Sequence, residues 1–451
     1  MIGREEQLSG LNGYYESDKN NLTIMYGRHG IGKTTLIKEF TAGKNVVYFE
    51  AVPADAAGML SAYCNAVSAQ LGVQVQYDNY VDIIRATAEK ITGPILLVFE
   101  EFQNMVKADG SFMSGIAALM RGAVTDKKIM VILTCPSVAW IENSMVKAIG
   151  DAAFSINVFM KLRGLSFANV VEMYPECDVR TILYMYAVTG GVPSYLQAWD
   201  TKSDVKSNIC RLFLRTGGLF RKEAENFIKD EFRESSVYNT LLGCLGSGMN
   251  KLNEIHTATG YGRDKISVYL NNLIEREIAE KIFSYDAGGS RDVRKGLYRI
   301  SDGFCNFWYS LVYPNAGMLG IMDEKEFYRR YIADGLEKYV LEAFIKVAVE
   351  FLDILSGAGR LVADVQYKGR WYGKSGNIHI IYENEQQDAV VAQVFAAGSP
   401  VSREDYDELV GSTELAGINV KQIFMFSTSG FDTELAAVQN DGLMLIRIED
   451  L

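Results

Sequence analysis

Short apolar runs alternate with amphipathic stretches along the first third of the chain. The apolar runs favour β-structure and lie at residues 22–26, 46–49, 95–99, 129–134 and between 154 and 162. Three stretches with helical periodicity follow the first two of these runs, at residues 35–40, 55–71 and 79–92. Buried strands that alternate with helices are typical of a parallel sheet covered on both faces. Residues 20–165 are therefore predicted to form a doubly wound α/β domain.

The pattern changes twice further along the chain. From about residue 166 it becomes helical, and the segment Gly190-Gly191-Val192-Pro193 interrupts it. This segment is either a plain helix break, which the sequence favours, or the hinge of a lid helix. Near the C-terminus, an amphipathic helix precedes four strand-like runs and a helix, at residues 336–355, 378–382, 389–395, 402–415, 420–426 and 443–446. That order predicts a second, smaller α/β domain.

The middle of the chain has the pattern of a winged helix-turn-helix. A short helix from Lys251, a turn at 259–262 and a second helix over 265–276 precede two wing strands, at 278–283 and 297–300. The basic side chains available to DNA phosphates are Arg263, Lys265, Arg291, Arg294 and Lys295. The alternative is a protein-packing module, and the balanced charge of this region favours neither interpretation. The predicted domains are residues 1–165, 166–233, 234–330 and 331–451.

The strongest motif is the glycine-rich segment between the first strand and the first helix. Its letters, Gly27-Arg28-His29-Gly30-Ile31-Gly32-Lys33-Thr34, have the spacing of a phosphate-binding loop. A strand, a glycine loop and a helix N-terminus together form an anion site, because backbone N–H groups and the helix dipole favour negative charge. Lys33 is predicted to neutralise the β- and γ-phosphates, and the Thr34 hydroxyl to bind Mg²⁺. Nucleotide contacts are also expected from Thr35.

A pair of carboxylates ends the third predicted strand. Glu100 and Glu101 stand where open α/β sheets place their ligands. One carboxylate would hold Mg²⁺ through water, for which we assign Glu100, and Glu101 would polarise the attacking water. The alternative is a solvated strand end. Thr134, at the end of the fourth strand, either senses the γ-phosphate or caps the next turn.

Composition and charge exclude several classes of protein. The six cysteines form no Cys-x-x-Cys and the chain has three histidines, which argues against a disulfide framework and a zinc site. No apolar run approaches a membrane span, and the charged N-terminus lacks the apolar core of a signal peptide, so we expect a cytoplasmic protein. The net charge is −11. Residues 331–451 carry nine basic and nineteen acidic side chains, which weakens any DNA role for that segment.

Together these motifs resemble the archaeal-type ATPases of the AAA+/STAND superfamily. The resemblance is carried by Gly3-Arg4-Glu5 with Leu8, the phosphate loop, the acidic pair before Phe102-Gln103, and the segment at residues 190–193. It implies a P-loop ATPase core with a helical lid, bound ATP and Mg²⁺, and a following winged helix. It also implies a C-terminal domain similar to PD-(D/E)xK nucleases, with a restriction-endonuclease-like fold.

Three departures from that family pattern matter. The family usually has Asp-Glu where this chain has Glu100-Glu101, and it often has an arginine near the position of Ser155. In the nuclease-like domain, His379 stands where the acid is expected, and Gln393-Val394-Phe395 stands where Glu-x-Lys is expected. Neutral side chains do not supply the anionic oxygens that Mg²⁺ prefers. The nearby acids Glu383, Glu385 and Asp388 are expected to be solvated in a turn.

The sequence therefore predicts an ATP-binding regulatory ATPase that hydrolyses ATP slowly with Mg²⁺ and rearranges its other domains. No nuclease activity is expected. The alternative is a DNA-binding or scaffolding protein that holds ATP as a structural ligand. A protein partner or a second copy of the chain is compatible with either interpretation, and the phosphate loop is common to both.

Overall fold

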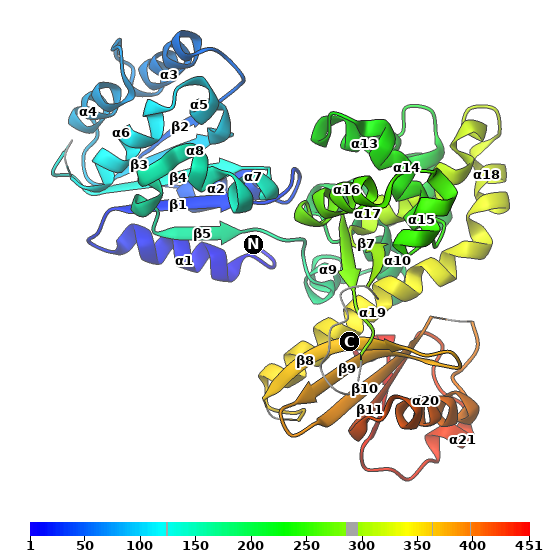
Figure 1. Ribbon diagram of the computed structural model, residues 1–451. Helices are drawn as coiled ribbons and strands as arrows, with labels where there is room; N and C mark the ends of the chain where they lie inside the picture. The colour runs from blue at the N-terminus through cyan, green and yellow to red at the C-terminus, as the bar shows by residue number, and fades with distance from the viewer. Residues whose placement is uncertain (123–124, 286–295, 363, 397) are drawn as a thin grey trace. The chain divides into compact units, whose positions relative to one another are not determined.

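The computed structural model describes residues 1–122, 125–285, 296–362, 364–396 and 398–451, apart from the side chains at 230 and 231. The chain divides into two compact units (Figure 1). The first comprises residues 1–164 together with 192–194, and the second comprises 165–191 together with 195–451. Each unit contains a five-stranded sheet with its own buried core.

The first unit is built on a parallel sheet with the strand order β2-β3-β4-β1-β5. Its strands are β1 (Asn21–Tyr26), β2 (Val46–Glu50), β3 (Ile95–Glu100), β4 (Ile129–Cys135) and β5 (Val158–Lys161). Every residue of β1, β3 and β4 is buried, as their largely apolar sequences predict. The α/β fold expected for this region is therefore confirmed.

Helices cover the parallel sheet, with α1 on one side of it and α3 and α4 on the other in Figure 1. They are α1 (Glu5–Glu16), α2 (Lys33–Thr41), α3 (Ala56–Leu71), α4 (Tyr80–Lys90), α5 (Phe102–Ala108), α6 (Ser111–Met120), α7 (Val138–Asn143), α8 (Met145–Ile149) and the 3-10 helix η1 (Gly150–Ser155). Because all strands run in parallel, their carboxyl ends meet at one edge, where the loops after β1, β3 and β4 carry the candidate residues.

The second unit begins with a helical region. Its elements are α9 (Phe167–Met173), α10 (Val179–Thr189), α11 (Pro193–Ala198, whose first two residues belong to the first unit), α12 (Val205–Ile209), η2 (Cys210–Leu214), α13 (Leu219–Glu231) and α14 (Ser235–Gly246). An aromatic cluster packs in this unit. Phe304 and Phe307 are fully buried, and their rings contact Phe213. These aromatic side chains therefore form part of the core of the second unit.

The segment predicted to be a winged helix-turn-helix contains two helices followed by a two-stranded antiparallel sheet. It consists of α15 (Leu252–Thr259), α16 (Arg263–Glu275), β6 (Ala279–Ile282) and β7 (Leu297–Ile300). The Arg263 side chain donates to Asn253 Oδ1 at 2.9 Å, and the Lys265 ammonium lies over the Tyr261 ring. The other predicted phosphate contacts lie outside the described residues; these are Arg291, Arg294 and Lys295.

Short helices and one long helix lead to the C-terminal sheet. They are α17 (Gly303–Phe307), η4 (Trp308–Val312), η5 (Tyr313–Met318), α18 (Glu324–Tyr331) and α19 (Ala333–Gly357). The sheet has the order β12-β11-β10-β9-β8, antiparallel from β8 to β10 and parallel from β10 to β12. Its elements are β8 (Val365–Tyr372), β9 (Asn377–Asn384), β10 (Asp388–Phe395), α20 (Arg403–Ala416), β11 (Asn419–Ser427), α21 (Thr433–Ala436), β12 (Leu443–Arg447) and η6 (Ile448–Asp450). This is the second α/β domain that the pattern predicts.

The expected positions of the three acids near its first hairpin need correction. Glu383 lies within β9 rather than in a turn, and it accepts a hydrogen bond from the Tyr285 hydroxyl at 2.5 Å. Asp388 begins β10, where it accepts from Asn419 and pairs with Lys421. Only Glu385 lies in the exposed turn. The strands extend past their apolar runs because their neighbours continue the pairing: Glu383 lies in register with Ala389 and Tyr367, and Asp388 with Asn419.

Candidate nucleotide-binding site

The loop between β1 and α2 has a backbone that glycine permits and other residues resist. Gly27, Gly30 and Gly32 have φ values of 149°, 76° and 98°. A Cβ atom at Gly27 would also meet the Leu162 carbonyl oxygen at 2.4 Å. Gly32 occupies the N-cap position of α2, so the loop delivers the chain directly into the helix whose first residue is Lys33. Glycine is required here because the chain must curl without a side chain in the way.

Lys33 is buried at the mouth of this loop. Its exposed fraction is 8%, and its ammonium donates to the carbonyl oxygens of Gly27 at 2.6 Å and Arg28 at 3.1 Å. Burial lowers the pKa of Lys33, while the carboxylates of Glu101 and Glu100 act in the opposite direction. Carbonyl oxygens are weaker partners for an ammonium group than phosphate oxygens are. The Lys33 ammonium can therefore exchange these carbonyl partners for a phosphate group.

Thr34 and Glu100, predicted separately as Mg²⁺ ligands, lie side by side. The Thr34 hydroxyl donates to Glu100 Oε2 at 3.0 Å. The other carboxylate oxygen, Oε1, is buried and has no hydrogen-bond partner among the described residues. Burial and the nearby Glu100 carboxylate raise the pKa of the Tyr48 phenol. An orphaned anionic oxygen beside a threonine hydroxyl fits a hard divalent cation, which takes oxygen ligands.

Glu101 occupies the sharp junction between β3 and α5. It has a left-handed backbone, with φ 55° and ψ 38°, and forms the N-cap position of α5. The Thr134 hydroxyl accepts its backbone N–H at 3.4 Å, and the Gln103 amide donates to its carboxylate at 2.8 Å. Thr134 therefore contacts Glu101, a contact that neither sequence interpretation of this threonine included.

The remaining loop residues differ in exposure. Ile31 is buried, Arg28 is half-buried, and His29 and Thr35 are exposed. The phosphate-loop backbone, Lys33, Thr34, Glu100, Glu101 and Thr134 are brought together at the carboxyl edge of the parallel sheet. Oriented donors, a buried cation and two carboxylates of different environment are the parts that phosphoryl transfer to water requires.

Sequence reasoning missed the role of Arg4, to which it assigned no contact. Glu5 and Glu6 are exposed, but Arg4 is only 5% exposed. Its guanidinium donates to the carbonyl oxygens of Ile31 at 3.1 Å and Arg163 at 2.6 Å. Arg4 thereby ties the phosphate loop to the segment after β5. The one available signal was Gly3-Arg4-Glu5 within the family resemblance.

The segment at residues 190–193 is a helix break, as the sequence favours. Gly190 ends α10 in the left-handed conformation and Pro193 begins α11. The same segment also contacts the phosphate loop, since the Ser194 N–H donates to the Gly30 carbonyl at 3.2 Å. A Cβ atom at Gly30 would meet Ser194 Oγ at 2.1 Å. The contact thus requires glycine at position 30.

The positions that a nuclease would use form a neutral hydrogen-bonded pair. The backbone N–H of His379 donates to Gln393 Oε1 at 3.1 Å, and the backbone N–H of Val394 donates to the ring nitrogen Nδ1 of His379 at 3.2 Å. Burial and the Arg370 guanidinium lower the pKa of His379 to about 4. Across the described part of the chain, no three side chains of His, Cys, Asp or Glu gather as a metal site.

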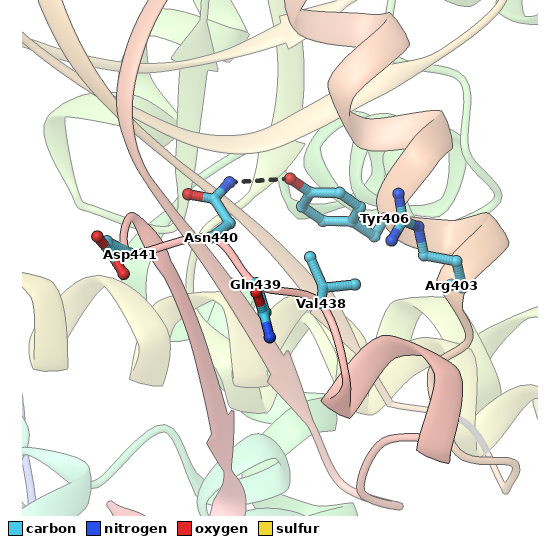
Figure 2. A pocket seen from close by; sticks show the side chains of 6 residues that line it. All are labelled: Arg403, Tyr406, Val438, Gln439, Asn440 and Asp441. Carbon is cyan, nitrogen blue, oxygen red and sulfur yellow. Dashed lines mark hydrogen bonds between the residues drawn. The ribbon is translucent and has the colours of Figure 1, made fainter.

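A second concave region lies on the C-terminal domain (Figure 2). It is an open, polar depression, lined by Arg403, Tyr406, Val438, Gln439, Asn440 and Asp441. The Asn440 amide donates to the Tyr406 hydroxyl at 3.1 Å, and Arg403 pairs with Asp407. The only cation among its lining residues, Arg403, is therefore already paired with a carboxylate.

In the described residues, no helix is long and apolar enough to cross a membrane.

Comparisons with known proteins agree with this geometry. Residues 1–198 match a family described as an ATPase domain predominantly from Archaea. Residues 308–394 match a family described as archaeal and bacterial proteins of unknown function. An uncharacterised protein of Methanocaldococcus jannaschii is 25% identical over 388 residues, which cover 85% of this chain and 84% of that protein. An uncharacterised ATP-binding protein of the same archaeon is 42% identical over 46 residues, 10% of this chain and 78% of that protein.

Solved structures resemble the chain at low sequence identity. A Walker-type ATPase of Pyrococcus abyssi is 13% identical, covers 68% of this chain and 96% of its own, and gives a TM-score of 0.48. The ORC2 protein of Aeropyrum pernix is 14% identical, covers 70% of this chain and 95% of its own, and gives a TM-score of 0.43. A nuclease relationship for the C-terminal domain stays a prediction from the sequence.

Proposed function

Starting from an archaeal-type P-loop ATPase domain over residues 1–198, we propose that this chain is a regulatory ATPase. It binds ATP with Mg²⁺ at the phosphate loop, hydrolyses it slowly, and passes the nucleotide state to its second unit. The observation that carries the proposal is the convergence of Lys33, Thr34, Glu100 and Glu101 at one edge of the sheet.

Binding of the triphosphate rests on the loop and Lys33. The backbone N–H groups that follow Gly27 precede α2, whose N-terminal dipole favours anions. A bound triphosphate would replace the carbonyl oxygens of Gly27 and Arg28 as partners of the Lys33 ammonium. Arg4 keeps the loop in place from behind through the Ile31 carbonyl.

The metal would be held by the Thr34 hydroxyl and the Glu100 carboxylate. Mg²⁺, when bound, supplies positive charge to the phosphate oxygens. Glu100 contributes a buried carboxylate oxygen that has no other partner in the described part of the chain. The Thr34 hydroxyl, which donates to Glu100 in this structure, would turn its lone pair toward the cation. Both side chains then serve the site without a change of backbone.

Glu101 would orient the attacking water and accept its proton. It stands one residue beyond Glu100, on a backbone fixed by the strand-to-helix junction. Unlike Glu100, it does not contact Thr34, so its carboxylate remains for the nucleophile. Two adjacent carboxylates in different surroundings can divide the metal-binding and base roles between them.

The contact between Gly30 and Ser194 supports a regulatory role. The Ser194 N–H donates to the loop carbonyl, and the chain continues from Ser194 into Tyr195, the first residue after it in the second unit. A phosphate that moves the Gly30 peptide therefore acts on the start of α11. This provides a covalent route by which nucleotide occupancy reaches the second unit.

The second candidate is a protein that binds ATP without turnover. Two features favour it: Glu100 replaces the aspartate usual in the family pattern, and the chain has no basic residue between Lys147 and Lys161. A longer side chain displaces the carboxylate, and a missing arginine would leave γ-phosphate charge uncompensated. DNA contact through α15 and α16 would accompany this function, although Arg263 and Lys265 already have partners on the protein.

Phosphate release from the full chain tests the proposal. Wild-type protein should release phosphate from ATP only with Mg²⁺, and Glu101→Gln should abolish turnover. Glu50→Gln is the matched control. Glu50 ends β2 and lies opposite Glu100, which ends β3, but the Glu50 side chain is exposed. The proposal of hydrolysis is wrong if wild type shows no Mg²⁺-dependent release. Equal rates in wild type and Glu101→Gln would place the base elsewhere.

A further inference from the structure

Gln103 is a buried glutamine whose amide faces the candidate base. It is the second residue of α5 and is 8% exposed. Its Nε2 donates to Glu101 Oε2 at 2.8 Å, while its own Oε1 is buried and unpartnered among the described residues. The hydrogen bond spans only two residues, across the junction between β3 and α5. Gln103 therefore reaches the carboxylate from a rigid position.

We propose that Gln103 is a positioning residue for hydrolysis: it holds Glu101 Oε2 so that Oε1 faces the attacking water. The inference rests on the proposed ATPase function and deepens it. Glu101 is the residue that touches the water, and Gln103 acts through Glu101. The hydrogen bond selects one carboxylate orientation among those that the Glu101 side-chain torsions allow.

The backbone of Glu101 is already fixed through both its N–H group and its carbonyl group. Its N–H donates to the Thr134 hydroxyl at 3.4 Å, and its carbonyl oxygen accepts from the Asn104 N–H at 2.9 Å. Its left-handed conformation occupies a narrow region of φ and ψ. The side-chain torsions are the freedom that remains. A single donor on one carboxylate oxygen removes most of that freedom.

The orientation of the Gln103 amide agrees with this role. A carboxylate only accepts hydrogen bonds, so the NH₂ group must be the part that faces Glu101. That orientation leaves the buried Oε1 of Gln103 without a partner among the described residues. The amide is therefore oriented by its hydrogen bond to the Glu101 carboxylate and not by its oxygen.

The test compares Gln103→Met with a matched variant in the full-length chain. Methionine keeps the length and apolar bulk but cannot donate a hydrogen bond. Asn104→Leu removes a neighbouring side-chain amide, which donates to the Ala51 carbonyl at 2.8 Å and not to Glu101. The backbone N–H of residue 104, which donates to the Glu101 carbonyl, is kept in this variant. Steady-state kcat and KM for ATP and the thermal midpoint are measured for all three proteins.

The inference predicts that Gln103→Met lowers kcat about tenfold and leaves KM within about twofold, because misplacing a reacting group slows chemistry and not binding. Asn104→Leu should keep kcat within about twofold of wild type at a comparable loss of thermal stability. If Gln103→Met keeps the wild-type kcat while Glu101→Gln abolishes turnover, the inference is wrong and the proposed function stands. Absence of turnover in wild type overturns both.

A second variant, Gln103→Glu, covers the case in which Gln103→Met does not fold. Glutamate keeps the length of the side chain but replaces the donating amide with a carboxylate, which only accepts hydrogen bonds. The inference predicts a folded protein with normal ATP affinity and a kcat lowered about tenfold or more, because Glu101 is no longer held. A wild-type kcat in folded Gln103→Glu would show that the hydrogen bond from Gln103 is irrelevant to turnover.

Discussion

His379 gives the C-terminal domain a stability that depends on pH in a defined direction. Its ring accepts the Val394 N–H at Nδ1, and Arg370 and Glu342 are the charged groups that face it. Burial and Arg370 lower its pKa to about 4, whereas a histidine in an unfolded chain titrates near 6.5. The folded state therefore keeps the imidazole neutral over a range of pH in which the unfolded state binds a proton.

The sign and size of the effect follow from proton linkage. Between about pH 6.5 and pH 4 the unfolded state binds more protons, so stability falls as the pH is lowered through that window. The difference between a pKa of about 4 in the folded state and about 6.5 in the unfolded state corresponds to about 3 kcal/mol, and the partial exposure of His379 reduces this to roughly 2 kcal/mol. Above pH 7 the contribution is fully present.

His379→Asn isolates this contribution. Asparagine Oδ1 can accept the Val394 N–H in place of Nδ1, but it does not titrate. The full chain is equilibrated in urea at pH 7.5 and at pH 4.5 and then digested by a short pulse of protease. The fraction of intact peptides from residues 365–447 at each urea concentration measures the stability of the C-terminal sheet. Wild type should lose about 2 kcal/mol more than the variant between the two pH values. Parallel losses would refute a neutral, buried His379.

Three further outcomes are expected. Glu101→Gly should be more stable than Glu101→Ala by about 1 kcal/mol in thermal or urea unfolding, because both lack the carboxylate and only glycine relaxes the left-handed backbone; equal stabilities would contradict that conformation. Gly191→Ala should destabilise by about 2 kcal/mol or more, since its Cβ would meet the Leu165 carbonyl oxygen at 2.3 Å; an unchanged midpoint would count against the close approach. Purified protein should cut neither plasmid nor linear DNA with Mg²⁺ or Mn²⁺, and cleavage that survives Lys33→Ala but disappears on deletion of residues 331–451 would overturn this.

The sequence was most informative where burial is complete and contacts are local. The strands β1, β3 and β4 have largely apolar sequences because both faces of a parallel sheet are covered. The loop residues Lys33 and Thr34 could be assigned because their spacing, strand and helix all lie within twenty residues. For the same reason the Glu100-Glu101 pair could be placed at the carboxyl edge of the sheet.

Features that depend on distant contacts were not predictable. Arg4 is buried by carbonyl groups 27 and 159 residues away, so the sequence around it shows only a charged cluster. Strand β8 is half-exposed at the edge of its sheet and contains Gly369, so it lacks the apolar run that revealed the others. The contact of Ser194 with Gly30 joins segments 164 residues apart, and no local pattern encodes it.

The most direct test of the central claim is calorimetric titration of ATP with Mg²⁺ into wild type, Lys33→Ala and Lys38→Ala. Lys38 lies in the same helix but is exposed, so it controls for loss of one positive charge. Removing a buried charged partner typically costs 2–5 kcal/mol of binding. We predict that Lys33→Ala weakens ATP binding by about a hundredfold or more, while Lys38→Ala binds like wild type. Equal ATP affinity in Lys33→Ala and wild type would contradict the assignment of this loop as the nucleotide site.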